Sequence, residues 1–235
     1  MDDPTVPTQA AASHFLPLMS GFKSSMCLYG LVKTEGPGDD PGRERVQILC
    51  SPCNNGAKAI RAFLSRLDAE LMARTLAKEG YRVISLAWFE PGQHIHDHQG
   101  WLMMHVCCGF TAQAGRLLSD NGHLMPLGWF IYSETGPWTA KHYVDWGPEM
   151  AQLLQNSHAA IGLPNYNAWL NELDSACEAQ MRWQVDEAWR ALPPLISHES
   201  ANQRALFDPA ERRWRFAATQ LEIRKPHPTV QDQGA

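Results

Sequence analysis

Short apolar runs bounded by turn residues dominate the first half of the chain. Runs of this length and composition are typical of buried strands. The pattern predicts strands at 26–32, 46–50, 81–89, 102–110 and 125–132. The polar segment 35–42, rich in Gly, Pro and Asp, predicts an exposed loop between the first two strands. Periodicity alone does not separate the run at 102–110 from a buried helix.

Apolar residues at three- and four-residue steps predict helices. The first stripe, capped by Asn54 or Asn55 and stopped by Gly80, consists of Ile60, Phe63, Leu64, Leu67 and Leu71. From residue 148 onward the pattern is helical, and helices are expected at 149–158 and 165–192. A last strand or helix is expected at 212–223.

Strands followed by helices predict an α+β fold with an antiparallel-rich sheet and a helical C-terminal half. One α+β domain is expected over residues 14–225, helix-rich from residue 148. The ends, 1–13 and 226–235, are expected to be disordered, because they offer little apolar surface to bury.

Composition narrows the classes of protein. The chain has 235 residues, of which 44% are apolar, and a net charge of -5, so nucleic acid is not an expected partner. The first residues have no basic and apolar leader, and no apolar stretch is long enough to span a bilayer. The six cysteines are therefore expected to stay reduced. Together these features predict a soluble, cytoplasmic protein with a small-molecule substrate or a protein partner.

Three histidines, His94, His96 and His98, alternate within five residues. In an extended backbone, alternate side chains share one face, and imidazoles gathered on one face bind divalent transition metals. The cluster therefore predicts a metal site. The alternative is a polar loop whose histidines hydrogen-bond locally, for example to Asp97.

The segment Pro91-Gly-Gln-His-Ile-His-Asp-His-Gln-Gly-Trp101, followed by Val106 and Gly109, resembles the first motif of cysteine dioxygenase-type cupins. The resemblance implies a β-barrel, here distorted and cupin-like, that holds a mononuclear Fe(II) ion. It also implies that O₂ is inserted into a small thiol.

By this resemblance, His96 and His98 are iron ligands, and a later histidine completes the set. His142, followed by Tyr143, is the nearest match for that third ligand among the later histidines. His94 and Asp97 are expected beside the ligands, where they would orient the imidazoles.

A second chemical pattern lies between the strand at 46–50 and the helix predicted after it. Ser51, with Lys58 and Arg61 nearby, predicts an anion-binding site for phosphate or nucleotide. The flanking Cys50 and Cys53 form a CxxC pair, which admits a redox role as an alternative.

The leading functional hypothesis is a metal-binding protein, in its most concrete form a non-haem iron oxygenase acting on a small thiol. The main alternative is a non-enzymatic interaction protein that binds a protein partner through its helical C-terminal half, centred on 165–192. Phosphate or nucleotide binding at 51–61 is the third hypothesis.

Overall fold

A computed structural model describes residues 23–37, 44–53, 56–137, 143–144, 146–163, 165–197 and 201–219. The segments predicted to be disordered, 1–13 and 226–235, lie outside the described residues.

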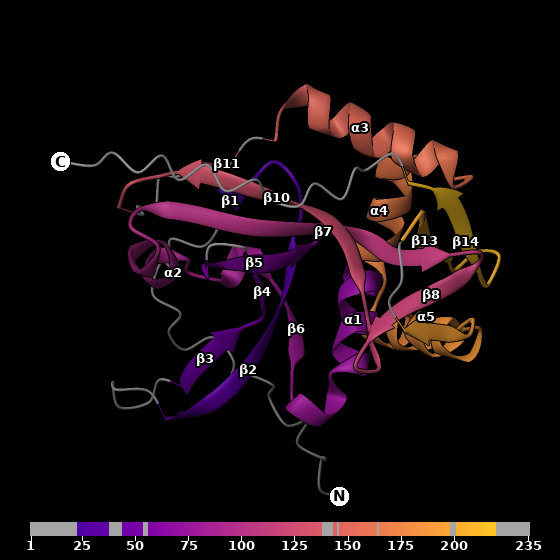
Figure 1. Ribbon diagram of the computed structural model, residues 1–235, viewed down its shortest axis with the longest axis horizontal. Coiled ribbons are helices and arrows are strands. Elements are labelled where there is room, and N and C mark those ends of the chain that lie inside the picture. The colour runs from indigo at the N-terminus through magenta and orange to yellow at the C-terminus, as the bar shows by residue number, and fades with distance from the viewer. Residues whose placement is uncertain are drawn as a thin grey trace, which may run out of the picture.

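Most strands belong to one twelve-stranded mixed sheet (Figure 1), whose main path runs β12-β8-β7-β5-β2-β3. Its strands are β2 (Tyr29–Pro37), β3 (Glu44–Ile48), β4 (Cys50–Pro52), β5 (Lys58–Phe63), β6 (Arg82–Ser85), β7 (Trp101–Gln113), β8 (Arg116–Asp120), β9 (His123–Leu124), β10 (Pro126–Glu134), β12 (Leu195–Ser197), β13 (Gln203–Asp208) and β14 (Arg213–Ala218). A separate parallel pair joins β1 (Lys23–Ser24) to β11 (Tyr143–Val144).

Five α-helices accompany the sheet in the described residues. They are α1 (Arg66–Thr75), α2 (Gly92–Asp97), α3 (Gly147–Ala160), α4 (Tyr166–Ser175) and α5 (Glu178–Arg190), with short 3₁₀ turns at Ala77–Glu79 and Leu86–Trp88. Figure 1 shows α3 along one side of the molecule, and α4 and α5 gathered with β13 and β14 at one end. No helix in the described ranges has the length and apolarity needed to cross a membrane.

Strand β7 is the centre of the sheet. It pairs with β5 in parallel and with β10, β13 and β8 antiparallel. Every residue from Leu102 to Ala112 is buried. Even-numbered side chains such as Met104 and Val106 join a core with residues of α2, α3 and α4, whereas Cys107 packs toward α1 on the opposite face. Burial on both faces explains the nearly continuous apolar run.

The predicted fold class is wrong. Most strand pairs are antiparallel, but the sheet is mixed, since β5 pairs with β7 and β12 with β8 in parallel, and its main path is open rather than a cupin-like barrel. The C-terminal half is not simply helical, because β12, β13 and β14 follow α5. Strand β14 lies inside the segment 212–223, where a strand or helix is expected. Strands β12 and β13 are not predicted, because they are short and their burial depends on elements distant in the sequence.

The first predicted helix begins later than its apolar stripe. Ile60 and Phe63 belong to β5, and Ser65 caps α1 by accepting a hydrogen bond from the Asp68 backbone N–H at 3.3 Å. Strand β5 is buried on both faces, so its apolar run imitates helical spacing. The helix predicted at 165–192 is likewise broken between α4 and α5, at Ala176 and Cys177.

Two ion pairs join α1 to α5 across the sequence. Arg66 contacts Glu178, and Arg74 contacts Asp186. Both pairs join residues that are 112 positions apart, so the two helices run parallel with matched registers. Because the four side chains are partly exposed, each pair adds little stability by itself but fixes how the helices align.

Strand β10 requires glycine at position 128. The β10–β7 register shifts between Pro126 and Gly128, and a Cβ built on Gly128 would lie 2.0 Å from the Val106 carbonyl oxygen. We expect Gly128→Ala to lower the free energy of unfolding by about 3 kcal/mol, because two paired backbones would have to separate. Urea denaturation measures this change.

Gly136→Ala is the control for that substitution. Gly136 has a left-handed backbone (φ 60°), but its added Cβ would meet nothing within 4 Å, so it lacks the steric contact found at Gly128. Its cost should be about 1 kcal/mol, from the left-handed backbone alone. Equal costs for the two variants would contradict the steric explanation.

Candidate functional site

The histidine segment is helical rather than extended. It forms α2 and its C-terminal turn, so residues four apart share a face and alternate residues do not. The rings of His94 and His98 lie 4.2 Å apart, whereas the side chain of His96 is 84% exposed. The structure therefore brings together His94 and His98, and not the predicted ligand pair.

Hydrogen bonds already occupy both ring nitrogens of His98. Its Nδ1 lies 2.6 Å from the His94 carbonyl oxygen, to which it must donate, and its Nε2 accepts from the Lys58 backbone N–H at 3.2 Å. The Nε2 atom of His94 is buried and has no hydrogen-bond partner within the described part of the chain. Burial, and then the neighbouring His98, lower the pKa of His94 to about 4, so this imidazole is neutral near pH 7.

The other members of the predicted metal site are dispersed or lie outside the description. Asp97 accepts from Gln93 Nε2 at 2.7 Å and lies 3.5 Å from His96 Nδ1, at the surface. His142 is outside the described residues. Within the described ranges, no three side chains of His, Cys, Asp or Glu gather as metal ligands. The iron site at His96, His98 and His142 stays a prediction.

A different polar cluster lies across three strands of the sheet. Arg61 of β5 is in register with His105 of β7, and Ser51 comes from the neighbouring strand β4. Arg61 Nε donates to Ser51 Oγ at 3.0 Å, and Ser51 Oγ lies 2.8 Å from His105 Nδ1. Because Ser51 Oγ accepts from Arg61, its own proton is directed to His105.

The environment of His105 keeps its ring neutral. Burial, and then the charge of Arg61, lower the pKa of His105 to about 3. The ring stacks on Phe130 of β10 at 4.6 Å, with 7° between the planes. A neutral Nδ1 accepts the Ser51 proton at any pH above the acid range. The hydrogen-bond chain from Arg61 through Ser51 to His105 is therefore permanent near pH 7.

The cluster lies where α1 no longer covers its face of the sheet. Side chains of α1 pack on Phe63 and Cys107, and one step along these strands come Arg61 and His105. Phe130, Tyr132 and Trp101 continue the same face, because Phe130 and Tyr132 are in register with odd-numbered residues of β7. We call the set Ser51, Arg61, Trp101, His105, Phe130 and Tyr132 the open sheet face.

Two of the three predicted anion-binding residues belong to this face. Ser51 and Arg61 are in contact. Lys58 is not part of the cluster, because it is three residues from Arg61 on one strand and strand side chains alternate. Both terminal nitrogens of Arg61 have no hydrogen-bond or ion-pair partner among the described residues. The guanidinium fork is therefore available to a ligand.

The geometry supports binding rather than nucleophilic catalysis by Ser51. A general base needs a pKa near the working pH, and His105 is several units too acidic. The hydrogen bond from Arg61 also makes the Ser51 oxygen less electron-rich. Ser51 and His105 instead act as a support that holds the Arg61 side chain in place.

The CxxC pair is not arranged for disulfide chemistry. Cys50 packs with the core beneath α2 and α3, whereas Cys53 packs with Ala59 and Met103 on the opposite face of the sheet. Burial raises the pKa of the Cys50 thiol to about 11, so it is a poor thiolate. The redox alternative loses its structural basis.

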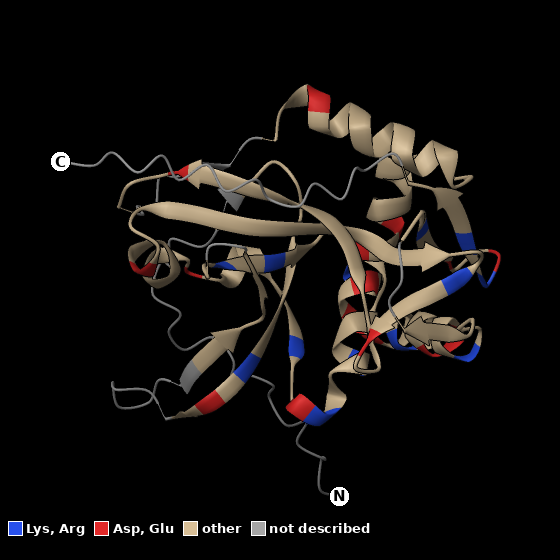
Figure 2. Cartoon of the chain, in the orientation of Figure 1, with Lys and Arg blue, Asp and Glu red and all other residues tan. Residues whose placement is uncertain are grey.

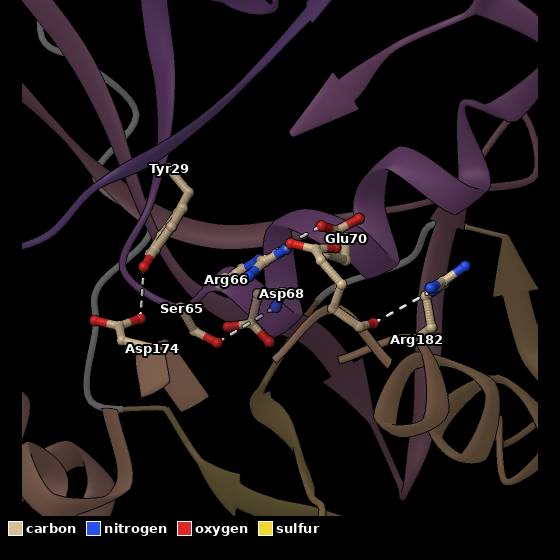
Figure 3. A network of polar contacts seen from close by, with 8 residues as sticks. Tyr29, Ser65, Arg66, Asp68, Glu70, Asp174 and Arg182 are labelled. Atoms are coloured by element: carbon tan, nitrogen blue, oxygen red, sulfur yellow. Dashed lines mark hydrogen bonds and ion pairs between the residues drawn. The ribbon is translucent and has the colours of Figure 1, made fainter. Parts of the chain in front are cut away.

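A second polar network surrounds the start of α1 (Figure 3). Tyr29 Oη donates to Asp174 at 2.7 Å, and Arg66 reaches Glu70 and Glu178 on the other side. Figure 3 shows Asp68 beside Ser65 in the middle of this network. Asp68 is 1% exposed, and burial raises its pKa to about 7 against the opposing charge of Arg204.

Sequence patterns do not point directly to His105, Phe130 or Tyr132 as site residues. His105 is the single histidine inside an apolar run, and its polar partner Ser51 is 54 positions away. The alternation of Phe130 and Tyr132 within an apolar strand was the available signal for a shared face. Only strand register reveals that this face is the one that carries Arg61.

Comparison with known proteins does not assign this chain to a family. A scan of family models and searches of curated proteins and of solved structures all give no match to this chain.

Asp68 should make stability depend on pH. Its native pKa of about 7 lies above the ordinary value of 3.8, so the native state keeps a proton that the unfolded state loses between these values. Stability contributed by this group therefore falls as pH rises toward 7. The free energy of unfolding of Asp68→Asn, measured by urea denaturation relative to wild type, should rise by about 3 kcal/mol from pH 5 to pH 8.

Asp120→Asn is the control, because Asp120 is an exposed aspartate. Its stability should follow the wild-type pH profile. If the free energies of unfolding of Asp68→Asn and wild type differ by the same amount at every pH in this range, Asp68 does not hold a proton in the native state.

Proposed function

We propose that this chain is a non-enzymatic binding protein that docks an acidic segment of a protein partner on the open sheet face. The observation that carries the proposal is Arg61, which is fixed at Nε by Ser51 and has no partner at its terminal nitrogens among the described residues. A planar guanidinium fork presented in this way matches a carboxylate with two parallel hydrogen bonds.

The support beneath Arg61 favours affinity. A free arginine side chain loses conformational entropy when it is fixed by a ligand. Here the hydrogen bond from Nε to Ser51, backed by buried His105, has already restricted the side chain. Less entropy remains to be lost when a partner carboxylate binds.

Aromatic side chains next to Arg61 fit a protein surface. Tyr132 is 43% exposed and Trp101 is 40% exposed, and both lie on the same face as the half-buried Phe130. Trp, Tyr and Arg are the residues that most often dominate the energy of protein interfaces. Their grouping supports a protein partner that presents apolar side chains beside its carboxylate.

The charges around this face are mixed, so the acidic partner is recognised by the fork of Arg61 rather than by a broad positive patch. Strand β2 carries both Lys33 and Glu35 (Figure 2). Exposed Glu134 of β10 alternates with Phe130 and Tyr132, so it lies on the same side of the sheet as these rings. Affinity for a carboxylate then depends on the two hydrogen bonds that the Arg61 fork can donate.

The helical half offers less support as the docking surface. The apolar stripe predicted at 165–192 contributes Leu173, Met181 and Val185 to the core. Trp183 is partly exposed, and the guanidinium carbon of Arg212 lies over its ring, 5.1 Å from the ring centroid. The open sheet face is therefore a better candidate for the docking surface than the C-terminal helices. The Fe(II) oxygenase hypothesis, with a small thiol as substrate, stays a prediction that metal analysis of the full chain can test.

Selection from a library of short random peptides tests the proposal. We expect peptides enriched on the full chain to carry Asp or Glu beside aromatic or aliphatic residues. For a synthetic copy of one such peptide, Arg61→Gln should weaken binding by about tenfold or more, because a charge-assisted bidentate contact is lost. Isothermal titration calorimetry measures the dissociation constants.

Arg82→Gln is the matched control, since Arg82 is an exposed strand arginine outside the open sheet face. It should change binding by less than about twofold. Selected peptides without acidic residues, or equal losses in the two variants, would refute docking at Arg61. Circular dichroism verifies that both variants are folded.

A further inference from the structure

A buried arginine in β13 is the centre of a second site. Arg204 is 2% exposed. Its Nε donates to the Cys108 carbonyl oxygen at 2.6 Å, and its Nη1 donates to Ser157 Oγ. Gly109 (φ 122°) permits this approach, because a Cβ there would lie 2.7 Å from the Ala205 carbonyl oxygen.

The third nitrogen of Arg204 faces a neutral imidazole. Nη2 lies 3.2 Å from His158 Nε2, and His158 Nδ1 lies 3.0 Å from the Leu154 carbonyl oxygen, to which it must donate. Burial, and then the Arg204 charge, lower the pKa of His158 to about 2. All the hydrogen-bond partners of Arg204 among the described residues are therefore uncharged at neutral pH.

No carboxylate among the described residues forms an ion pair with Arg204. The nearby acid of β13, Asp208, is paired with Arg215 at 2.7 Å. Asp68 acts on Arg204 from a distance, without a hydrogen bond, and its raised pKa leaves it partly protonated at neutral pH. A buried guanidinium without a full counter-charge is costly, since arginine does not lose its proton.

Two further donors beside the same imidazole have no acceptor. Tyr166 Oη and Trp169 Nε1 are buried and have no hydrogen-bond partner among the residues that the structure describes. The rings of these residues lie 4.1 Å and 5.3 Å from the His158 ring. Tyr166 is itself 3% exposed. Buried donors in native proteins are normally satisfied, so two orphans next to an unpaired cation indicate a missing acceptor.

We propose that Arg204, Tyr166 and Trp169 hold a small monovalent anion of the halide class beside His158. The unmatched groups are one positive charge, which Asp68 offsets only in part, and two N–H or O–H donors; together they complement a single negative acceptor. The surroundings are apolar, with Leu154 and Leu206 in the adjoining cores. Such surroundings favour one small charge over a multiply charged phosphate. The site is separate from Arg61 and does not depend on the proposed function.

Bromide titration of the full chain tests this site. Protein purified in sodium gluconate, whose anion is too large for a buried site, is melted with increasing sodium bromide at constant ionic strength and at pH 6. The midpoint of thermal unfolding should rise by several degrees in the wild type, because bromide binds the native state.

Tyr166→Phe removes one orphan donor and keeps the ring. Without bromide this variant should be as stable as the wild type or more so, and with bromide its midpoint should rise less than half as far. Tyr81→Phe, outside the site, should respond as the wild type does. No rise in the wild type, or an equal rise in Tyr166→Phe, would overturn the proposal.

Anomalous diffraction from crystals soaked in bromide gives an independent answer. A bromide peak within hydrogen-bond distance of Arg204 and Tyr166 is expected. Peaks only at the protein surface would overturn the proposal even if the melting temperature rises, because the stabilisation would then come from other sites.

Discussion

The burial of β7 on both faces is the constraint on which the rest of the structure depends. A thirteen-residue strand with eleven consecutive buried residues needs neighbours along both edges and cover on both faces. Strands β5, β10, β13 and β8 supply the edges. Helices α2, α3 and α4 cover one face, but α1 covers only part of the other. The open sheet face exists because that cover ends.

Each proposed site contains an arginine on a strand that pairs with β7. Arg61 reaches the edge of the covered region, where Ser51 and His105 hold it without neutralising it. Arg204 is enclosed by the core, where His158 stays neutral and provides no counter-charge. In each case burial favours the neutral imidazole, so the arginine keeps its charge for a ligand.

Local patterns predicted elements better than they predicted connections. The strand candidates at 102–110 and 125–132 correspond to β7 and β10, because nearly continuous apolar runs with strand propensity leave few alternatives. The apolar stripe predicts a start for α1 that is too early, since residues of β5 also satisfy helical spacing. The short strands β12 to β14 carry no strong period, so the pairing of β12 with β8, of β13 with β7 and of β14 with β13 could not be anticipated.

The sequence by itself determined that Ser51 and Arg61 belong to one polar region, since they are ten residues apart. It also determined the apolar character of β7. Tertiary structure decided that Ser51 and Arg61 lie on the paired strands β4 and β5 rather than at the start of a helix. Tertiary structure alone decided that His105, 54 positions from Ser51, completes the cluster. It also decided that His94 pairs with His98 rather than His96 with His98, because the segment packs as a helix and the helical period replaces the strand period.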